Sequence, residues 1–324
     1  MPNIEPIAPS FPKNPVLNER YRPNTVADCI LPEGTRKIFD KMVDTGHIDN
    51  MLFAGSAGTG KTTLAKALCE QLGIEYIFIN ASDERGLDVI RTRIANFAGT
   101  VSITGKRKCV ILDEADQLPM ATQGAFRNAL ESLSRNCAFI LTCNYPNQII
   151  DPIRSRLVEV DFAVDDSTRI DMMMLVFDRV QGILKNEGIA YEETPLLELV
   201  NALYPDNRRL LNIIDHYSKM NGTIDVGILE SIKDVSIDAL VDALKAADFK
   251  AVRSWCAEAA ANNVTNIYGK LYRILMHHVE GDSIPELIIT INDAQRYDDR
   301  VPDKELHLTA MCVELLSECT FKDD

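Results

Sequence analysis

The chain has 324 residues, a mass of 36.2 kDa and a formal net charge of −14 at pH 7, and 46% of its residues are hydrophobic. A chain of this length and composition can bury large cores and form two or three domains, which excludes a disordered or fibrous protein. Its apolar runs are far shorter than the ~18–20 residues of a membrane span, and prolines stand where a signal peptide needs its apolar stretch, so we expect a soluble, cytoplasmic protein with no membrane partner.

The spacing of the cysteines and the distribution of charge further limit the kinds of protein that fit this sequence. The eight cysteines include no C-x-x-C pair, which argues for neither a zinc site nor a disulfide framework, so we expect reduced, packed thiols. The acidity lies mainly in the second half of the chain, and within residues 81–110 the sign of the charge reverses. The basic residues there are Arg85, Arg91, Arg93, Lys106, Arg107 and Lys108. A local basic face of this kind is enough for phosphate contacts, whatever the net charge of the whole chain.

The first half of the chain has the pattern of an α/β domain. Residues 1–35 are rich in proline and end in turn residues, so they are expected to form an extended lead-in and not a folding unit of their own. Short apolar runs then alternate with helical stretches such as Thr62 to Leu72, which stops at Gly73. The runs are 51–54, 76–79, 109–112 and 138–142. This alternation predicts a parallel sheet covered by helices on both faces.

After about Phe162 the strand signals nearly vanish, and helical spacing takes over. The helical stretches are 171–185, 195–204, 208–220 and most of 226–322, separated by short turns. We therefore expect an α/β domain over residues 1–165, a small helical domain over 166–231 and a helical carboxy-terminal domain over 232–324.

The strongest chemical signal is a G-x-x-x-x-G-K-[ST] phosphate loop that follows an apolar strand and opens a helix. Backbone N–H groups of such a loop surround the phosphates of a nucleotide, the lysine reaches the β and γ phosphates, and the following hydroxyl ligates Mg²⁺. The candidate nucleotide-binding residues are Gly55, Ser56, Ala57, Gly58, Thr59, Gly60, Lys61, Thr62 and Thr63. A glycine turn without a binding role is the less favoured interpretation, because both the motif and the strand and helix on either side of it fit a phosphate loop.

An acidic pair follows the apolar run 109–112, at the end of the strand where open α/β sheets place their ligands. Asp113 is expected to hold Mg²⁺ through water, and Glu114 to polarise the attacking water. The alternative is that both carboxylates only cap the next helix. The pair favours ATP hydrolysis over passive binding.

Further along the chain, Asn144 follows the next apolar strand and could project toward the γ phosphate, although Asn-Tyr-Pro is equally typical of a turn. Arg154 and Arg156 precede the end of the α/β domain, and Arg208 and Arg209 begin a later helix. Arginine suits developing phosphoryl charge, but each of these residues could also form a surface ion pair.

Taken in order, these motifs resemble those of the AAA+ ATPases, and particular phrases resemble clamp-loader subunits. Residues 19–23 resemble the E-K-Y-R-P phrase of that family, which implies that Tyr21, Arg22 and Pro23 lie near the adenine. Residues 80–91 are similar to the N-A-S-D-E-R-G-I-D-V-V-R phrase of replication factor C small subunits, 112–116 repeat L-D-E-A-D, and 205–209 resemble G-D-M-R-[KR]. Chain length and the tail around residues 305–308 look similar to the large subunit of T-even-type phage clamp loaders.

The resemblance implies an AAA+ phosphate-loop domain, a helical lid and a helical collar for oligomerisation, with ATP and Mg²⁺ as cofactors. It implies a subunit of a five-membered assembly that opens a ring-shaped sliding clamp, places it on primer-template DNA and releases it on ATP hydrolysis. The compartment would be the host cytoplasm if a phage encodes the chain. The collar faces would meet the other subunits, although packing within the bundle alone accounts for part of that surface.

Roles for single residues also follow from the resemblance. Asn144 would sense the γ phosphate, Arg208 would act as the lid arginine in its own subunit, and Arg156 would be the finger supplied to a neighbour's ATP. The family has Ser-Arg-Cys where this chain has Ser-Arg-Leu, which leaves Arg154 as a rival finger. The candidate DNA contacts are Arg91, Arg93, Gln123 and Arg127, and the stretch around 117–126 is a candidate clamp contact.

Two other functions remain open at this point. An AAA+ remodeller of DNA junctions or a helicase loader would share the phosphate loop and the acidic pair. A stator-like clamp-loader subunit that does not hydrolyse ATP would share the architecture, but the intact Lys61, Thr62, Asp113 and Glu114 disfavour it. A GTPase is disfavoured because the sequence has no N-K-x-D base-reading motif.

Overall fold

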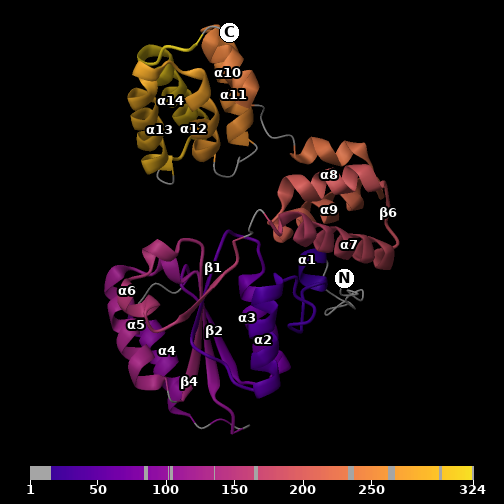
Figure 1. Ribbon diagram of the computed structural model, residues 1–324, viewed down its shortest axis with the longest axis vertical. Helices are drawn as coiled ribbons and strands as arrows, with labels where there is room; N and C mark the ends of the chain where they lie inside the picture. Colours follow the sequence, from indigo (N-terminus) through magenta and orange to yellow (C-terminus); the bar gives the residue numbers. More distant parts are fainter. Residues whose placement is uncertain are drawn as a thin grey trace. The chain divides into compact units, whose positions relative to one another are not determined.

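The computed structural model forms two compact units, Met1–Ser231 and Ile232–Asp324, each described here by itself (Figure 1). The structure describes residues 16–83, 87–100, 102, 105–134, 136–163, 167–232, 237–261, 267–298 and 301–322. In that described part, no helix is long and apolar enough to cross a membrane.

The first unit is built on a five-stranded sheet with the order β2-β3-β4-β1-β5. Every neighbouring pair of strands is parallel, so the carboxyl ends of the strands meet at one edge. The strands are Met51–Ala54 (β1), Tyr76–Asn80 (β2), Lys108–Asp113 (β3), Cys137–Cys143 (β4) and Val158–Asp161 (β5). The four expected strands are confirmed. The sequence reading missed β5, an edge strand in which three of four residues are exposed.

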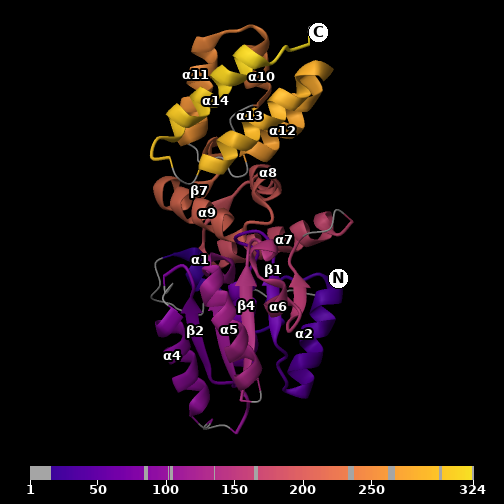
Figure 2. The ribbon, with the colours of Figure 1, turned by 90° about the vertical axis from the view of Figure 1, so that its left-hand side faces the viewer.

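Helices cover both faces of this sheet (Figure 1). Alternate strand residues point to opposite faces. Phe53, Ile111 and Ile140 pack with the helices Glu33–Thr45 (α2) and Lys61–Gln71 (α3). Leu52, Leu112 and Leu141 pack on the other side, where the helices are Leu87–Gly99 (α4), Met120–Leu133 (α5) and Asp151–Arg154 (α6). Figure 2 shows the α4 and α5 layer in front of the strands. The expected parallel sheet with two covered faces is therefore present.

Part of the amino-terminal segment differs from its prediction as an extended lead-in. Residues 1–15 lie outside the described part, but a short helix, Leu17–Arg20 (α1), follows at once. Val26, Cys29 and Leu31 are buried in the core beneath α2 and α3. Prolines and turn residues concealed this role, because the segment binds through a few separated apolar side chains without a helical or strand period.

Three longer helices complete the first unit: Arg169–Glu187 (α7), Glu193–Leu203 (α8) and Asn207–Asn221 (α9). They agree closely with the expected helical stretches. Asp206 caps α9 by accepting a hydrogen bond from the Arg209 amide at 3.0 Å. The strands Ala190–Tyr191 (β6) and Thr223–Ile224 (β7) form a small parallel pair. Short 3-10 helices are Ala115–Gln117 (η1), Pro146–Gln148 (η2) and Val226–Ile232 (η3).

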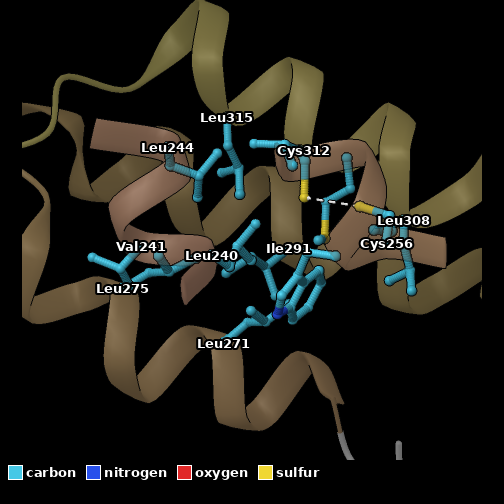
Figure 3. Close-up of a cluster of buried hydrophobic side chains, with 14 of the residues drawn as sticks. Leu240, Val241, Leu244, Cys256, Leu271, Leu275, Ile291, Leu308, Cys312 and Leu315 are labelled. Atoms are coloured by element: carbon cyan, nitrogen blue, oxygen red, sulfur yellow. Dashed lines mark hydrogen bonds between the residues drawn. The ribbon is translucent and has the colours of Figure 1, made fainter. Parts of the chain in front are cut away.

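The second unit is a helical bundle, as the periodicity predicts. Its elements are Ile237–Lys245 (α10), Phe249–Ala261 (α11), Ile267–His278 (α12), the 3-10 turn Gly281–Ser283 (η4), Ile284–Tyr297 (α13) and Lys304–Glu318 (α14). Leu240, Leu271 and Leu315 meet in its core, and the thiols of Cys256 and Cys312 lie 3.8 Å apart between α11 and α14 (Figure 3). All eight cysteines of the chain are buried and unbridged, so the expectation of packed free thiols is confirmed.

Candidate active site

The loop between β1 and α3 has the backbone conformation that a phosphate loop requires. Gly58 and Gly60 have φ values of 77° and 93°, in the region that favours glycine. A Cβ added at Gly58 would lie 1.8 Å from Asp206 Oδ1, because the start of α9 approaches the loop closely. The Asn207 amide also donates to the Gly58 carbonyl at 3.2 Å. The loop therefore contacts both its own sheet and the helices that follow it.

Lys61 lies at the mouth of this loop and is almost fully buried. Its Nζ donates to the carbonyls of Gly55 at 2.8 Å and Ser56 at 2.7 Å, and to Asn144 Oδ1 at 3.0 Å. Burial lowers the pKa of Lys61, and the positive charge of Arg208 acts in the same direction, while nearby carboxylates oppose it. Lys61 and Asn144 are thus in direct contact, and Arg208 lines the same cavity.

The acidic pair lies at the carboxyl end of β3, opposite the start of α3. Thr62 Oγ1 donates to Asp113 Oδ1 at 2.6 Å, and Thr142 Oγ1 donates to the same oxygen at 2.6 Å. The Thr142 hydroxyl in turn accepts the Glu114 amide at 3.1 Å. The hydroxyl of Thr62 and the carboxylate of Asp113 are therefore close enough to share one hard cation. Sequence reasoning missed Thr142, because threonine in an apolar strand is ordinary.

Glu114 has a left-handed backbone, with φ 54° and ψ 43°. A non-glycine residue in this region carries strain of order 1–3 kcal/mol, and such strain clusters at functional sites. The next turn places Asp116, whose Oδ2 accepts the backbone amides of Asn144 and Tyr145 at 3.0 Å each. Asp116 thereby fixes the end of β4 against the end of β3. It closes the L-D-E-A-D phrase, which was its only signal in the sequence.

A cavity of about 300 Å³ lies between the loop and the helices α7 and α9. Its lining includes Tyr21, Arg22, Pro23, Asp113, Glu114, Asn144, Arg208 and the run from Ala57 to Thr63. One part of the wall is polar, around the loop and the acidic pair. Another part is apolar and includes Ile30, Leu31 and Val180. A purine nucleotide is divided in the same way, since its phosphates are charged and its base has apolar faces.

Residues 21–23 line this cavity, but the side chains of Tyr21 and Arg22 have partners within the chain. The Tyr21 hydroxyl donates to Glu187 Oε1 at 2.6 Å, and Arg22 pairs with Glu19 at 2.5 Å. Burial, with the hydrogen bond to Glu187, raises the pKa of Tyr21 to about 12. Glu187, at the end of α7, has no counterpart among the expected site residues.

Arg154 and Arg156 do not line the cavity of their own chain. Arg154 pairs with Glu159 at 2.9 Å, next to the edge strand β5. Arg156 pairs with Glu131 of α5 at 2.5 Å and donates to the Pro152 carbonyl at 2.5 Å. Both guanidinium groups are partly exposed at the rim of the α/β part, where another chain could reach them.

The expected DNA contacts fall on α4 and α5, which pack together, but not all of them face outward. Arg93 is exposed on α4, whereas the side chain of Arg91 lies outside the described part. Arg127 is exposed on α5 and pairs with Glu131 at 3.2 Å. Gln123 requires a correction, because it is only 1% exposed. Its amide donates to the carbonyls of Leu118 and Gln148, and its Oε1 accepts the Ile150 amide. Gln123 is a buried connector and not a surface contact.

The basic excess within residues 81–110 also divides into two groups. Lys106 donates to the Leu72 carbonyl, and Arg107 to the carbonyls of Ile48 and Cys137. Lys108 is 4% exposed and donates to the Phe97 carbonyl. These three side chains serve backbone groups near the amino end of β3. Lys108 therefore adds nothing to a basic surface, whereas Lys106 remains exposed and Arg107 is half-buried.

Comparisons with known proteins match this architecture along the chain. A family model for ATPases associated with various cellular activities covers residues 51–164. Models for the sliding-clamp-loader large subunit match its AAA+ ATPase lid domain at 168–230 and its C-terminal domain at 265–320. The sliding-clamp-loader large subunit of Enterobacteria phage T4 is 33% identical over 96% of this chain and 98% of that protein. The chain belongs to the sliding-clamp-loader family of AAA+ ATPases.

Other relatives place this clamp-loader chain among related ATPases. The large subunit of Escherichia phage RB69 is 32% identical over 96% of the chain and 98% of that protein. The replication factor C small subunit of Haloarcula marismortui is 36% identical over 73% of the chain and 74% of that protein. The solved Thermotoga maritima RuvB Holliday junction branch migration motor has a TM-score of 0.52 at 16% identity, over 65% of this chain and 71% of that one. That likeness shows the shared fold alone.

Proposed function

We propose that the chain is an ATP-hydrolysing subunit of a sliding-clamp loader, in which ATP binding drives clamp opening and primer-template binding, and hydrolysis releases the closed clamp on DNA. The observation that carries the proposal is similarity to a sliding-clamp-loader large subunit over 96% of the chain, together with an intact phosphate loop and acidic pair. We further propose three domains, an ATPase domain over 1–165, a lid over 166–231 and a collar over 232–324.

The phosphates would lie against the loop from Gly55 to Thr63, of which Ala57 to Thr63 line the cavity, and the base would lie against the apolar wall near Leu31 and Val180. Lys61 is already held at the mouth of the loop, so its ammonium would exchange carbonyl partners for the β and γ phosphates. Thr62 and Asp113 fit Mg²⁺, because both present oxygen atoms to one point. When bound, Mg²⁺ would neutralise charge on the phosphates.

For hydrolysis, we assign Glu114 to the attacking water, because this residue lines the cavity and its backbone amide donates to Thr142. Asn144 would orient that water and contact the γ phosphate from its place beside Lys61. Arg208 would contribute positive charge from α9 within the same chain. Arg156 would act on the nucleotide of a neighbouring subunit, since it does not line its own cavity.

The partners we propose are other loader subunits in a five-membered assembly, a ring-shaped sliding clamp and primer-template DNA. Exposed arginines on α4 and α5 supply the DNA surface, with Arg93 and Arg127 as the described candidates. We expect ATP turnover to be low in the isolated chain and strongly stimulated only when DNA, companion subunit and clamp are added together.

Lys61→Ala tests the nucleotide site directly. The change removes the cation at the mouth of the loop, so both ATP affinity and hydrolysis should be lost together. Titration calorimetry with a non-hydrolysable ATP analogue measures the affinity, and phosphate release measures the turnover of the assembled loader. Normal analogue affinity in this variant would show that the cavity is not the ATP site.

A further inference from the structure

Two walls of the nucleotide cavity are joined by the segment Val16–Leu31, here named the strap. At its beginning, helix α1 packs against α9 of the lid. At its end, Val26, Cys29 and Leu31 are buried in the core of the ATPase domain. Between these two anchors, Tyr21 and Arg22 line the cavity. The strap therefore connects the lid to the ATPase domain along the nucleotide site.

The strap also binds the carboxyl end of α7 through a group of three side chains, here named the clasp: Arg20, Tyr21 and Glu187. Glu187 Oε1 accepts the Tyr21 hydroxyl at 2.6 Å, and Glu187 Oε2 pairs with Arg20 Nη1 at 2.5 Å. Tyr21 is only 3% exposed, and the Arg20 and Glu187 side chains are about one-fifth exposed. Farther along α7, Arg179 donates to the Asp28 carbonyl of the strap.

The protonation states of the clasp are fixed over the neutral range. Because burial and the Glu187 hydrogen bond raise the pKa of Tyr21 to about 12, its hydroxyl remains a donor. Burial alone would raise the pKa of Glu187, but the hydrogen bonds from Tyr21 and Arg20 outweigh burial and lower it. The acceptor is thus a carboxylate, and hydrogen bonds to a charged acceptor are about twice as strong as neutral ones.

We propose that the clasp holds the lid against the strap and thereby sets the rate at which nucleotide leaves the cavity. The inference rests on the proposed function, because it requires that nucleotide occupies this cavity. Glu187 does not line the cavity, so it is a positioning residue that acts through Tyr21 and the lid. A nucleotide between the strap and α7 can leave along this side only when the two walls separate and the clasp opens.

The test measures release of a fluorescent ATP analogue from the full chain by stopped flow, with excess ATP as the chase. Glu187→Ala removes both clasp contacts and should release the analogue about tenfold faster, the effect of losing charge-assisted hydrogen bonds near a partly solvated surface. Glu187→Gln keeps an acceptor for Tyr21 but loses the ion pair, and Tyr21→Phe keeps the ion pair but loses the hydroxyl. Both should give smaller accelerations.

The control is Glu198→Ala, which removes an exposed carboxylate from α8 of the same lid and should leave release unchanged. The double variant Tyr21→Phe/Glu187→Ala should release at the rate of Glu187→Ala, because both changes remove the same contact. A general loss of lid stability would instead make the two effects add. A release rate in Glu187→Ala equal to that of the wild-type chain would contradict the proposed role of the clasp. Additive effects of the two changes would contradict it as well. Failure of the wild-type chain to bind the analogue would overturn the proposed function itself.

Discussion

Thr142 serves both acidic residues of the site with a single hydroxyl, donating to Asp113 and accepting the Glu114 amide. We expect Thr142→Val to lower the turnover number of the assembled loader about 10- to 100-fold, the range for a lost partner of a metal-binding or catalytic carboxylate. ATP affinity should change much less, because Lys61 and the loop are untouched. Steady-state ATPase assays and analogue titrations separate the two effects.

Thr142→Ser is the matched variant, since it keeps the hydroxyl and removes only a methyl group. It should retain most of the wild-type turnover. Equal losses in the Val and Ser variants would mean that strand packing at this position, and not the hydroxyl, supports hydrolysis.

At the scale of elements, Asp298 joins three helices of the second unit. Following α13, it accepts hydrogen bonds from Tyr268 of α12 at 2.7 Å and from Lys304 of α14 at 2.6 Å. Burial would raise the pKa of Asp298, but these hydrogen bonds outweigh it and hold the pKa below its usual value. A lowered pKa stabilises the fold above the pKa of the unfolded chain, and this contribution is lost as the pH falls through the folded value.

Asp298→Asn should therefore lower the free energy of unfolding by about 1 kcal/mol at pH 7, and the difference should be smaller at a second, acidic pH below the ordinary aspartate pKa of ~3.9. Urea unfolding at both pH values gives the measurement. Trp255, the single tryptophan of the chain, lies in the same core and reports on this unit. Asp293→Asn, on an exposed pair with Arg296, should have almost no effect. A pH-independent loss in Asp298→Asn would show that its charge is not responsible.

Helices and strands with a strong hydrophobic pattern were predictable from the sequence. Segments that are held in the fold by a few isolated contacts were not. Four strands, α3, and the helices α7 to α9 follow from apolar runs and helical spacing. Strand β5 is short and mostly exposed, so its sequence lacks the apolar run of a buried parallel strand. The strap carries its apolar anchors without a period.

The same division holds for the candidate site. Residues whose types follow a phosphate-loop pattern were found, because the chemistry demands them at fixed spacing. Thr142 and Glu187 act through contacts with residues far away in the chain, which spacing does not encode. The burial of Gln123 was hidden for a similar reason, since its three partners come from loops around η1 and η2.

At the scale of the whole molecule, Arg93 tests the DNA surface. Arg93→Ala in the assembled loader should weaken binding to all sequences alike and reduce the slope of log affinity against log salt by ~1, because the contact that we propose is to phosphate. Lys41→Ala provides the same loss of charge on α2, which covers the opposite face of the sheet, and should leave binding unchanged. Unchanged affinity and slope for Arg93→Ala from low to moderate salt would remove α4 from the DNA surface.

A substitution at Arg156 tests whether each ATP site includes an arginine from the neighbouring subunit. Arg156→Ala should keep ATP binding in its own subunit and lower assembly turnover by something like ~10³-fold, the lower range for arginine fingers. Glu114→Gln should bind ATP without hydrolysing it. Assemblies that mix the two variants should recover some hydrolysis, where a normal Glu114 faces a normal Arg156 from another chain.

Arg154→Ala is the necessary comparison, because both arginines lie in the same rim and form intrachain pairs. It should retain turnover if Arg156 is the finger. Loss of turnover in Arg154→Ala alone would assign the finger to Arg154, and full turnover in both variants would contradict a site shared between subunits.

The burial of every native thiol makes the chain suited to site-specific labelling. Buried, unbridged cysteines react slowly, because the reagent cannot reach a sulfur atom that lies inside the core. A cysteine introduced at an exposed position, such as Glu198 on α8, would react first with a maleimide dye, without removal of any native cysteine. A dye on the lid and another on the ATPase domain would then report lid opening in a single assembled loader, turnover by turnover.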